Sequence, residues 1–194
     1  MQKIAARQKR TEFHAVYISN MIPSKGYEDV AMGLAIARRE HGLPLRADFV
    51  GGWPSEQARA QFDAMLASEG LSDVVTVHGA VHDRPWIRER LLSADAFLLP
   101  TYYPVEAQPL SIIEALNAAT PVISTHHASI PDYIRNDENG YLVGKKNPAE
   151  IAEALRRLHD LPTWSRLARN ARDTFDSTFG PEVIRSAFLE AFAP

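Results

Sequence analysis

The sequence predicts an α/β protein built on a Rossmann-like, doubly wound parallel sheet of about six strands, closed by C-terminal helices. Between residues 13 and 148, short apolar or β-branched segments alternate with amphipathic segments. Several short segments are apolar on both faces, as is typical of strands in a parallel sheet that helices cover on both sides. Such an alternation requires right-handed crossovers between the strands. Beyond residue 148 the pattern is helical only.

The expected elements follow one another in a regular order. Six segments are predicted to be strands, namely residues 13–19, 45–51, 73–79, 95–100, 121–125 and 140–144. Four capped helices are expected between them: one from Ser24 to Gly42, one from Ser55 to near Gly70, one from around Pro85, and one with Pro109 at its first position. Three more helices are expected after residue 148, with breaks at Pro162 and Gly180.

The composition narrows the possible functions. A chain of 194 residues, with 45% hydrophobic and 23% charged residues, is suited to one well-buried soluble domain. The net charge of -3 argues against broad electrostatic binding of nucleic acid. The absence of cysteine excludes disulfides and thiolate metal sites. No apolar run approaches the roughly 18 residues of a membrane helix, and the polar start MQKIAARQKR lacks a signal-peptide core, so a cytoplasmic protein is expected.

Candidate functional residues fall at one edge of the predicted sheet. Open parallel sheets bind ligands at the carboxyl ends of their strands, where loops and helix N-termini converge. The segments SNMIPSKG, GGW, GAVHD, TYYPVEAQP and HHAS each follow one of the first five predicted strands. His126 and His127 are interpreted as loop residues, because adjacent side chains diverge at a strand end and no third metal ligand accompanies them.

Two carboxylates, Glu106 and Glu114, stand out in the mostly apolar segment YYPVEAQPLSIIEALNAATPVIS. If the helix begins at Pro109, Glu106 lies just outside its N-terminus and Glu114 lies about 7 Å further along the axis. The free N–H groups of the first turn then form a phosphate site between two acids that can bind sugar hydroxyls. Taken alone, Glu106 is better explained by the helix dipole. Glu114 is harder to explain in this way, because a buried carboxylate among apolar residues is costly without partners.

Lys25 gives a second indication of an anion site. It is predicted to lie in the first turn of its helix, where a cation is disfavoured. A bound anion would compensate its charge, and Gly26 would let the backbone approach that anion closely. Taken alone, Lys25 is better explained as a solvated lysine whose alkyl stem covers the neighbouring strand.

These segments resemble a known family. VEAQPLSIIEALNAATPVIST resembles the E-x7-E signature of retaining glycosyltransferases with the GT-B architecture, and YISNMIPSKGYEDV resembles the strand, loop and helix that open their donor-binding half. VTVHGAV, SADAFLLPTYY and IPDYIRNDENGYLV also resemble family segments, and the similarity covers almost the whole chain in the same order. The resemblance therefore implies one half of a GT-B enzyme.

The resemblance also implies roles for individual residues. Glu106 would be catalytic, binding the donor sugar and supporting the charge that develops at its anomeric carbon, while Glu114 would bind the ribose of the nucleotide. Lys25 would neutralise the leaving diphosphate, and Asn20 stands where the family commonly has an arginine. The residues assigned to binding of the nucleotide or its diphosphate are Asn20, Lys25, Gly26, Gly79, Tyr102, Gln108, Leu110 and Glu114.

The donor and partners are further implications of the resemblance. It implies transfer of a hexose-type sugar from a nucleotide diphosphate, with a UDP-sugar favoured and a GDP-sugar as the alternative. No cofactor is expected, and no metal either, since the sequence contains no Asp-x-Asp pair. An acceptor-binding N-terminal domain is expected as a partner that this chain lacks.

The domain organisation follows from the same resemblance. The donor-binding domain is expected at residues 13–177, after a polar lead-in at 1–12 and before a C-terminal helix at 178–194. A non-catalytic nucleotide-sugar sensor or assembly module is the alternative function. Peripheral association with the inner face of the membrane, through arginines on the last helices, is left open.

Overall fold

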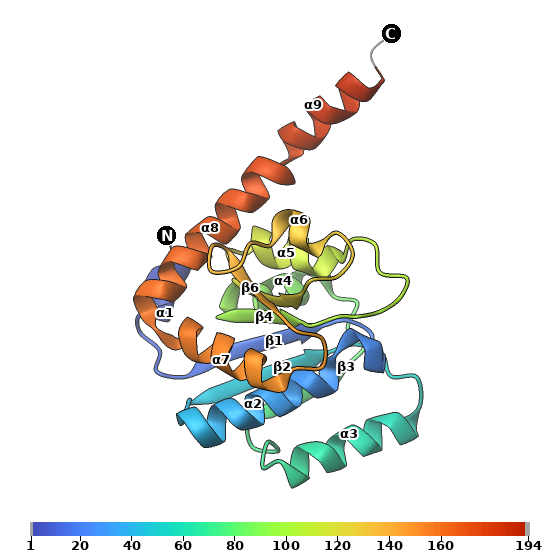
Figure 1. Cartoon of the computed structure of the whole chain (residues 1–194), viewed down its shortest axis with the longest axis vertical. Coiled ribbons are helices and arrows are strands. Elements are labelled where there is room, and N and C mark those ends of the chain that lie inside the picture. The colour runs from blue at the N-terminus through green and yellow to red at the C-terminus, as the bar shows by residue number, and fades with distance from the viewer. Residues whose placement is uncertain (1, 193–194) are drawn as a thin grey trace.

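A six-stranded, all-parallel sheet forms the centre of the protein, as predicted (Figure 1). The structure is a computed structural model of the chain that describes residues 2–192. The sheet order is β3-β2-β1-β4-β5-β6. Its strands are β1 (Phe13–Ile18), β2 (Leu45–Val50), β3 (Val75–Gly79), β4 (Ala96–Leu99), β5 (Val122–Thr125) and β6 (Gly140–Val143).

Helices cover both faces of this sheet. They are α1 (Gln2–Arg7), α2 (Tyr27–His41), α3 (Glu56–Ser68), α4 (Arg84–Ser93), α5 (Leu110–Asn117), α6 (Ile130–Tyr133), α7 (Pro148–His159), α8 (Leu161–Thr178) and α9 (Pro181–Ala191). The chain moves from β1 outward to β3 and then returns to β4 on the other side of β1. Right-handed crossovers therefore place α2 and α3 on one face and α4 and α5 on the other. In Figure 1, α2 and α7 cross in front of the sheet.

The helix boundaries differ from the prediction at two positions near the expected site. The helix expected to start at Ser24 starts at Tyr27 as α2, after Gly26. Pro23–Lys25 form a separate 3-10 turn. Gly26 has a φ of 80°, a left-handed conformation that interrupts the helix. Pro109 has an extended ψ of 109° and caps α5, which begins one residue later at Leu110. The short helix α6 was not predicted.

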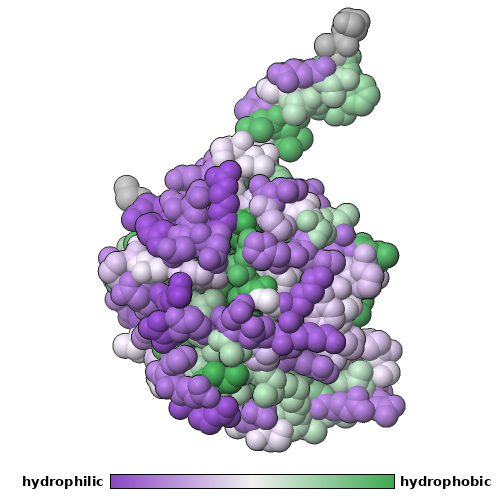
Figure 2. Space-filling view, viewed as in Figure 1, coloured by the Kyte–Doolittle hydropathy of each residue, from purple (hydrophilic) through white to green (hydrophobic). Residues whose placement is uncertain are grey.

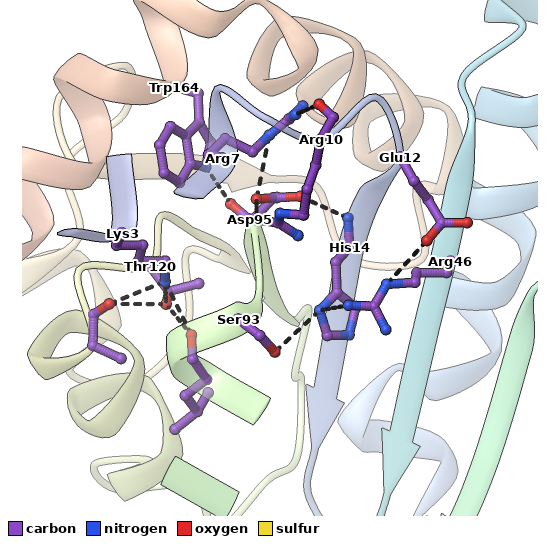
Figure 3. Close-up of polar contacts among 12 residues, drawn as sticks. Lys3, Arg7, Arg10, Glu12, His14, Arg46, Ser93, Asp95, Thr120 and Trp164 are labelled. Atoms are coloured by element: carbon purple, nitrogen blue, oxygen red, sulfur yellow. Dashed lines mark hydrogen bonds and ion pairs between the residues drawn. The ribbon is translucent and has the colours of Figure 1, made fainter. Parts of the chain in front are cut away.

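Part of the polar lead-in predicted at residues 1–12 is helical, since Gln2–Arg7 form α1, and contacts hold this segment against the sheet. Helix α1 lies against the edge where the strands begin, and Arg7 is buried there with 4% of its surface exposed. Arg10 donates to Asp95 Oδ1 at 2.8 Å, and Trp164 Nε1 donates to the Asp95 carbonyl at 2.7 Å (Figure 3). The lead-in and α8 thus both contact Asp95, the residue before β4. The sequence pattern missed this because the contacts join distant segments.

The last helix, α9, extends away from the body of the molecule in line with α8 (Figure 1). The predicted break at Gly180 is confirmed, since this residue caps α9. Four large apolar side chains of this segment are more than half exposed: Ile184, Phe188, Leu189 and Phe192. Figure 2 shows apolar surface along the projecting helix.

A buried polar row crosses the first three strands beneath α4. Asp48 on β2 accepts hydrogen bonds from His14 Nε2 at 2.8 Å and from His78 Nε2 at 2.7 Å. Burial alone would raise the pKa of Asp48, but the hydrogen bonds from the two imidazoles outweigh burial and hold this pKa well below its usual value. The charged carboxylate therefore joins β1, β2 and β3 through side chains.

Asp48→Asn should lower the free energy of unfolding by about 1.5–3 kcal/mol, because it removes a charged acceptor shared by two hydrogen bonds. Since the pKa of Asp48 is lowered on folding, this contribution is present above the unfolded value of 3.8 and decreases as the pH falls below it. Urea denaturation of both proteins at pH 7 and pH 3 measures the difference. A difference of the same size at both pH values would contradict the charged role of Asp48.

Candidate functional site

The site lies where the sheet order reverses. Strands β1 and β4 are neighbours, although they are far apart in sequence, and their carboxyl ends lie side by side. The loops that leave them are joined, because Tyr102 N donates to the Ser24 carbonyl at 2.8 Å and Thr101 Oγ1 contacts the same oxygen at 3.4 Å. Such a reversal point is where open α/β sheets bind their ligands.

Lys25 and Glu106, predicted separately from the sequence, form an ion pair across these two loops. Lys25 Nζ lies 2.5 Å from Glu106 Oε2, and only 13% and 9% of the two side chains are exposed. Thr101 Oγ1 donates to the same carboxylate oxygen at 3.2 Å, and Lys25 Nζ lies 4.6 Å from the centroid of the Tyr103 ring. The prediction that Lys25 belongs to the first turn of α2 was wrong, since it ends the 3-10 turn instead. Its charge is compensated by Glu106.

Gly26 allows this close approach of the two loops. A Cβ atom at this position would lie 2.6 Å from the Pro100 carbonyl oxygen, closer than real Cβ contacts come. The left-handed φ of 80° adds a second reason for glycine, because residues with a Cβ atom rarely adopt it. Gly26 thus holds Lys25 against the end of β4.

The loop that carries Glu106 is fixed from β5 and the segment after it. His127 Nε2 donates to the Tyr103 carbonyl at 2.7 Å, and Ser129 Oγ donates to the Ala107 carbonyl at 2.8 Å. Thr125 Oγ1 donates to the Thr101 carbonyl. The sequence predicts only a loop histidine at His127, and its position after β5 was the signal that could have indicated this contact. These contacts hold the Glu106 loop beside the start of α5.

The start of α5 presents free backbone donors. Across residues 2–192, no acceptor pairs with the N–H groups of Leu110 and Ser111. The Pro109 cap offers no side-chain acceptor, and both Gln108 and Leu110 are exposed. Unpaired amides and the positive end of the helix dipole make this terminus suited to an anion.

Glu114 lies apart from Lys25 and Glu106. It forms an ion pair with Arg84 at the start of α4, and 29% of its side chain is exposed. A cavity of about 560 Å³ adjoins this pair between α4 and α5, and neither Lys25 nor Glu106 lines it. The expectation of an apolar environment around Glu114 is therefore incomplete, since the carboxylate faces a cation and an open groove.

The remaining predicted residues border the same edge. Asn20 is exposed, and its carbonyl oxygen accepts from the Tyr17 hydroxyl at 3.3 Å. Gly79 ends β3 with a φ of 70°, and its carbonyl accepts from Gly51 N at 2.8 Å. Partial burial and two nearby carboxylates raise the pKa of Tyr102, so its hydroxyl remains a neutral donor.

Residues 2–192 contain neither a cluster suited to a metal ion nor a helix suited to crossing a membrane. No group of three or more histidine, aspartate or glutamate side chains in this range is arranged to hold a metal ion. None of its helices combines the length and the apolar character needed to cross a membrane.

Sequence comparisons identify related proteins. A model of the family described as glycosyl transferases group 1 matches residues 2–174. The glycogen synthase of Mycobacterium tuberculosis H37Rv is 27% identical over an alignment of 194 residues. This alignment covers 97% of this chain and 44% of that protein. The D-inositol 3-phosphate glycosyltransferase of Streptomyces griseus is 28% identical over 149 residues, which cover 74% of this chain and 30% of that protein. The chain thus spans less than half the length of these relatives.

Solved structures share the fold. HepE of Anabaena, crystallised with UDP, has a TM-score of 0.84 at 18% identity, and the match covers 99% of this chain and 52% of HepE. The C-terminal domain of LpcC, a glycosyl transferase group 1 family protein from Francisella tularensis, has a TM-score of 0.80 at 20% identity. That match covers 93% of this chain and 92% of the LpcC domain. The predicted half of a GT-B architecture is confirmed at the level of the fold.

A left-handed conformation costs an alanine about 1–2 kcal/mol. Gly26→Ala should lower the free energy of unfolding by more than this, because the new methyl group also meets the Pro100 carbonyl. Gly42→Ala is the matched control, since Gly42 also has a positive φ of 61° but a Cβ atom there would meet nothing within 4 Å. Urea denaturation of both variants measures the costs. Equal losses would show that the contact between the two loops is unimportant.

Proposed function

The chain belongs to the glycosyl transferases group 1 family, and we propose that it is the donor-binding half of a retaining glycosyltransferase. It would bind a nucleotide diphosphate sugar, with UDP-sugars favoured over GDP-sugars, for transfer of a hexose-type sugar to an acceptor. The observation that carries this proposal is the Lys25–Glu106 pair beside the free N-terminus of α5, at the reversal of the sheet.

The diphosphate would bind between Lys25 and the start of α5. The backbone donors around Gln108 and Leu110 lie at the helix N-terminus, and Lys25 supplies the positive side chain. Lys25 would exchange its bond to Glu106 for bonds to phosphate oxygens. Transfer of a sugar leaves negative charge on the diphosphate, so this arrangement stabilises the charge that develops in the transition state.

Release from Lys25 would leave Glu106 free to face the sugar. Thr101 keeps the carboxylate oriented through its 3.2 Å hydrogen bond. A carboxylate held in place and stripped of its cation can accept hydrogen bonds from sugar hydroxyls and support positive charge at the anomeric carbon. This role makes Glu106 the catalytic residue of the proposal.

The nucleoside would extend from the diphosphate toward α4. Glu114 would bind the ribose hydroxyls, with Arg84 as the cation that neutralises it before binding. Gly79 at the end of β3, Tyr102 after β4 and Asn20 after β1 would border the nucleotide, since all three lie at the same edge of the sheet. HepE, which shares the fold, was crystallised with UDP, and this supports a uridine nucleotide.

An acceptor-binding domain is the proposed partner. The curated relatives are more than twice as long as the region they share with this chain. The apolar side chains of Ile184 and Phe188 on the projecting α9, and of Phe192 at its C-cap, recur every four residues, so they form one face that a second domain can cover. An isolated helix of this length is marginal in water without such packing.

Membrane association through the last helices gains no support. Arg156 and Arg157 both pair with Glu153, and Arg172 pairs with Asp176. Acidic neighbours of this kind reduce the attraction of these helices for an anionic lipid surface. The absence of cysteine is consistent with the proposed cytoplasmic location.

A non-catalytic nucleotide-sugar sensor is the second candidate. The observation that favours it is Asn20, which leaves Lys25 without the second cation that an arginine would provide. Sugar transfer by the chain together with an acceptor domain would exclude the sensor. UDP-sugar binding without transfer under the same conditions would favour it.

Glu114→Ala should weaken UDP binding roughly 10- to 100-fold, the equivalent of losing hydrogen bonds to a charged group. Glu106→Ala should leave UDP binding unchanged or tighter, because it frees Lys25, and should reduce the preference for UDP-glucose over UDP. Isothermal titration calorimetry measures both. Glu138→Ala, which breaks another surface ion pair with an arginine, is the matched control. Equally weakened UDP binding in all three variants would refute the assigned roles. Unchanged UDP binding in Glu114→Ala would refute them as well.

UDP binding should need no divalent metal, because Lys25 and the start of α5 supply the positive charge. Calorimetric titration of UDP is made once with EDTA and once with excess magnesium or manganese. The dissociation constants are expected to agree. Strict dependence on the metal would overturn the proposed diphosphate site.

A further inference from the structure

The groove between α4 and α5 is bridged at both of its ends. At the end near the proposed nucleotide site, Arg84 and Glu114 form their ion pair across it. At the other end lie Leu91 and Ala118, which also line the cavity. Lys3 Nζ from α1 donates to both of their carbonyl oxygens, at 3.0 Å each (Figure 3). One side chain thus joins the last turn of α4 to the C-cap of α5.

The chemistry at this end suits the lysine ammonium group. Its three N–H donors meet three acceptors, since Thr120 Oγ1 also contacts Nζ. The carbonyls at helix C-termini lack partners within their own helix and carry the negative end of the helix dipole. Lys3 therefore satisfies the ends of two helices at once.

Helix α1 is held so that Lys3 stays in this position. Arg7 Nε lies 3.3 Å from Asp95 Oδ1, and Arg10 donates to the same oxygen at 2.8 Å. The other oxygen of Asp95 accepts from His14 N at 2.8 Å. The Asp95 side chain is fully buried. Two arginines on one buried carboxylate anchor the segment, and Figure 3 shows Lys3 and this cluster at the same edge of the sheet.

We propose that Lys3 is a positioning residue for the nucleotide site, fixing the spacing of α4 and α5 and with it the place of Glu114. The proposal rests on the proposed function, because it assigns Glu114 to the nucleotide. Glu114 lies one turn before Ala118 on α5. A shift of the α5 C-terminus relative to α4 therefore moves Glu114 against Arg84.

The Lys3 contact depends on pH, because the neutral amine has two N–H donors for the same three acceptors, whereas the ammonium group has three. Burial lowers the pKa of Lys3 to about 7; of the charges nearby, Asp95 raises this pKa and Arg10 lowers it further. The unfolded amine has a pKa of 10.5, so between pH 7 and pH 10.5 the unfolded chain holds a proton that the folded chain lacks. Stability linked to Lys3 therefore rises with pH across this window and is constant below it.

A double-mutant cycle with UDP as the probe tests the proposal. Lys3→Met, measured by calorimetry, should weaken UDP binding roughly 3- to 10-fold, as for other residues that act on a site from a distance. In a Glu114→Ala background the same substitution should have little effect, because the residue through which Lys3 acts is gone. Lys9→Met is the control, since Lys9 is an exposed lysine in the same segment. An equal loss in both backgrounds would overturn the proposal.

Two further measurements keep the test decisive. If Lys3→Met does not fold, Thr120→Val can replace it, and the same non-additivity with Glu114→Ala is expected. This substitution removes one acceptor of Lys3, together with the hydrogen bond from Thr120 Oγ1 to the Leu91 carbonyl, without changing the charge. Hydrogen exchange without ligand should quicken at the ends of α4 and α5 in the Lys3 variant but not in Lys9→Met. Unchanged exchange would refute the positioning role even if UDP fails to bind, whereas failure of UDP to bind the wild type would refute the proposed function alone.

Thermal unfolding provides the pH readout. The unfolding temperature of the wild type is expected to rise relative to that of Lys3→Met as the pH increases from 7 to 9, because only the wild type carries the Lys3 amine. A constant difference between the two midpoints would show that the Lys3 amine does not titrate on folding.

Discussion

The contact of Gly26 with Pro100 is the constraint on which the site depends. It brings the loop after β1 against the end of β4, where the sheet order reverses, so residues 81 positions apart can form the Lys25–Glu106 ion pair. A side chain larger than hydrogen at Gly26 would meet the Pro100 carbonyl and separate the two loops. The geometry of the proposed diphosphate site thus follows from one left-handed glycine and the topology around it.

Each carboxylate of the proposed site is paired with its own cation. Glu106 is neutralised by Lys25 and Glu114 by Arg84, so neither acid remains uncompensated near the sheet edge. Partial burial makes an unpaired charge costly, which explains why these pairs form. A nucleotide diphosphate would therefore replace the two ion pairs with its own contacts. Its negative phosphates would bind Lys25, and its hydroxyl groups would donate hydrogen bonds to the two acids.

The periodic features of the fold could be predicted from the sequence, whereas its long-range contacts could not. Alternating apolar segments predicted all six strands, and Ser55 and Gly42 marked helix ends because caps are local signals. The pairing of Lys25 with Glu106 required knowing that β1 and β4 are neighbours. The role of Lys3 could not be predicted from the polar lead-in, because its partners Leu91 and Ala118 lie 88 and 115 positions away in the sequence. His127 likewise gains its role only from the neighbouring loop.

A crystal structure of the chain with UDP tests the proposed site most directly. Lys25 Nζ is expected within hydrogen-bonding distance of a phosphate oxygen, with its bond to Glu106 broken, the diphosphate at the start of α5 and the ribose on Glu114. UDP bound elsewhere, or UDP at this edge with the Lys25–Glu106 pair still intact, would contradict the central claim.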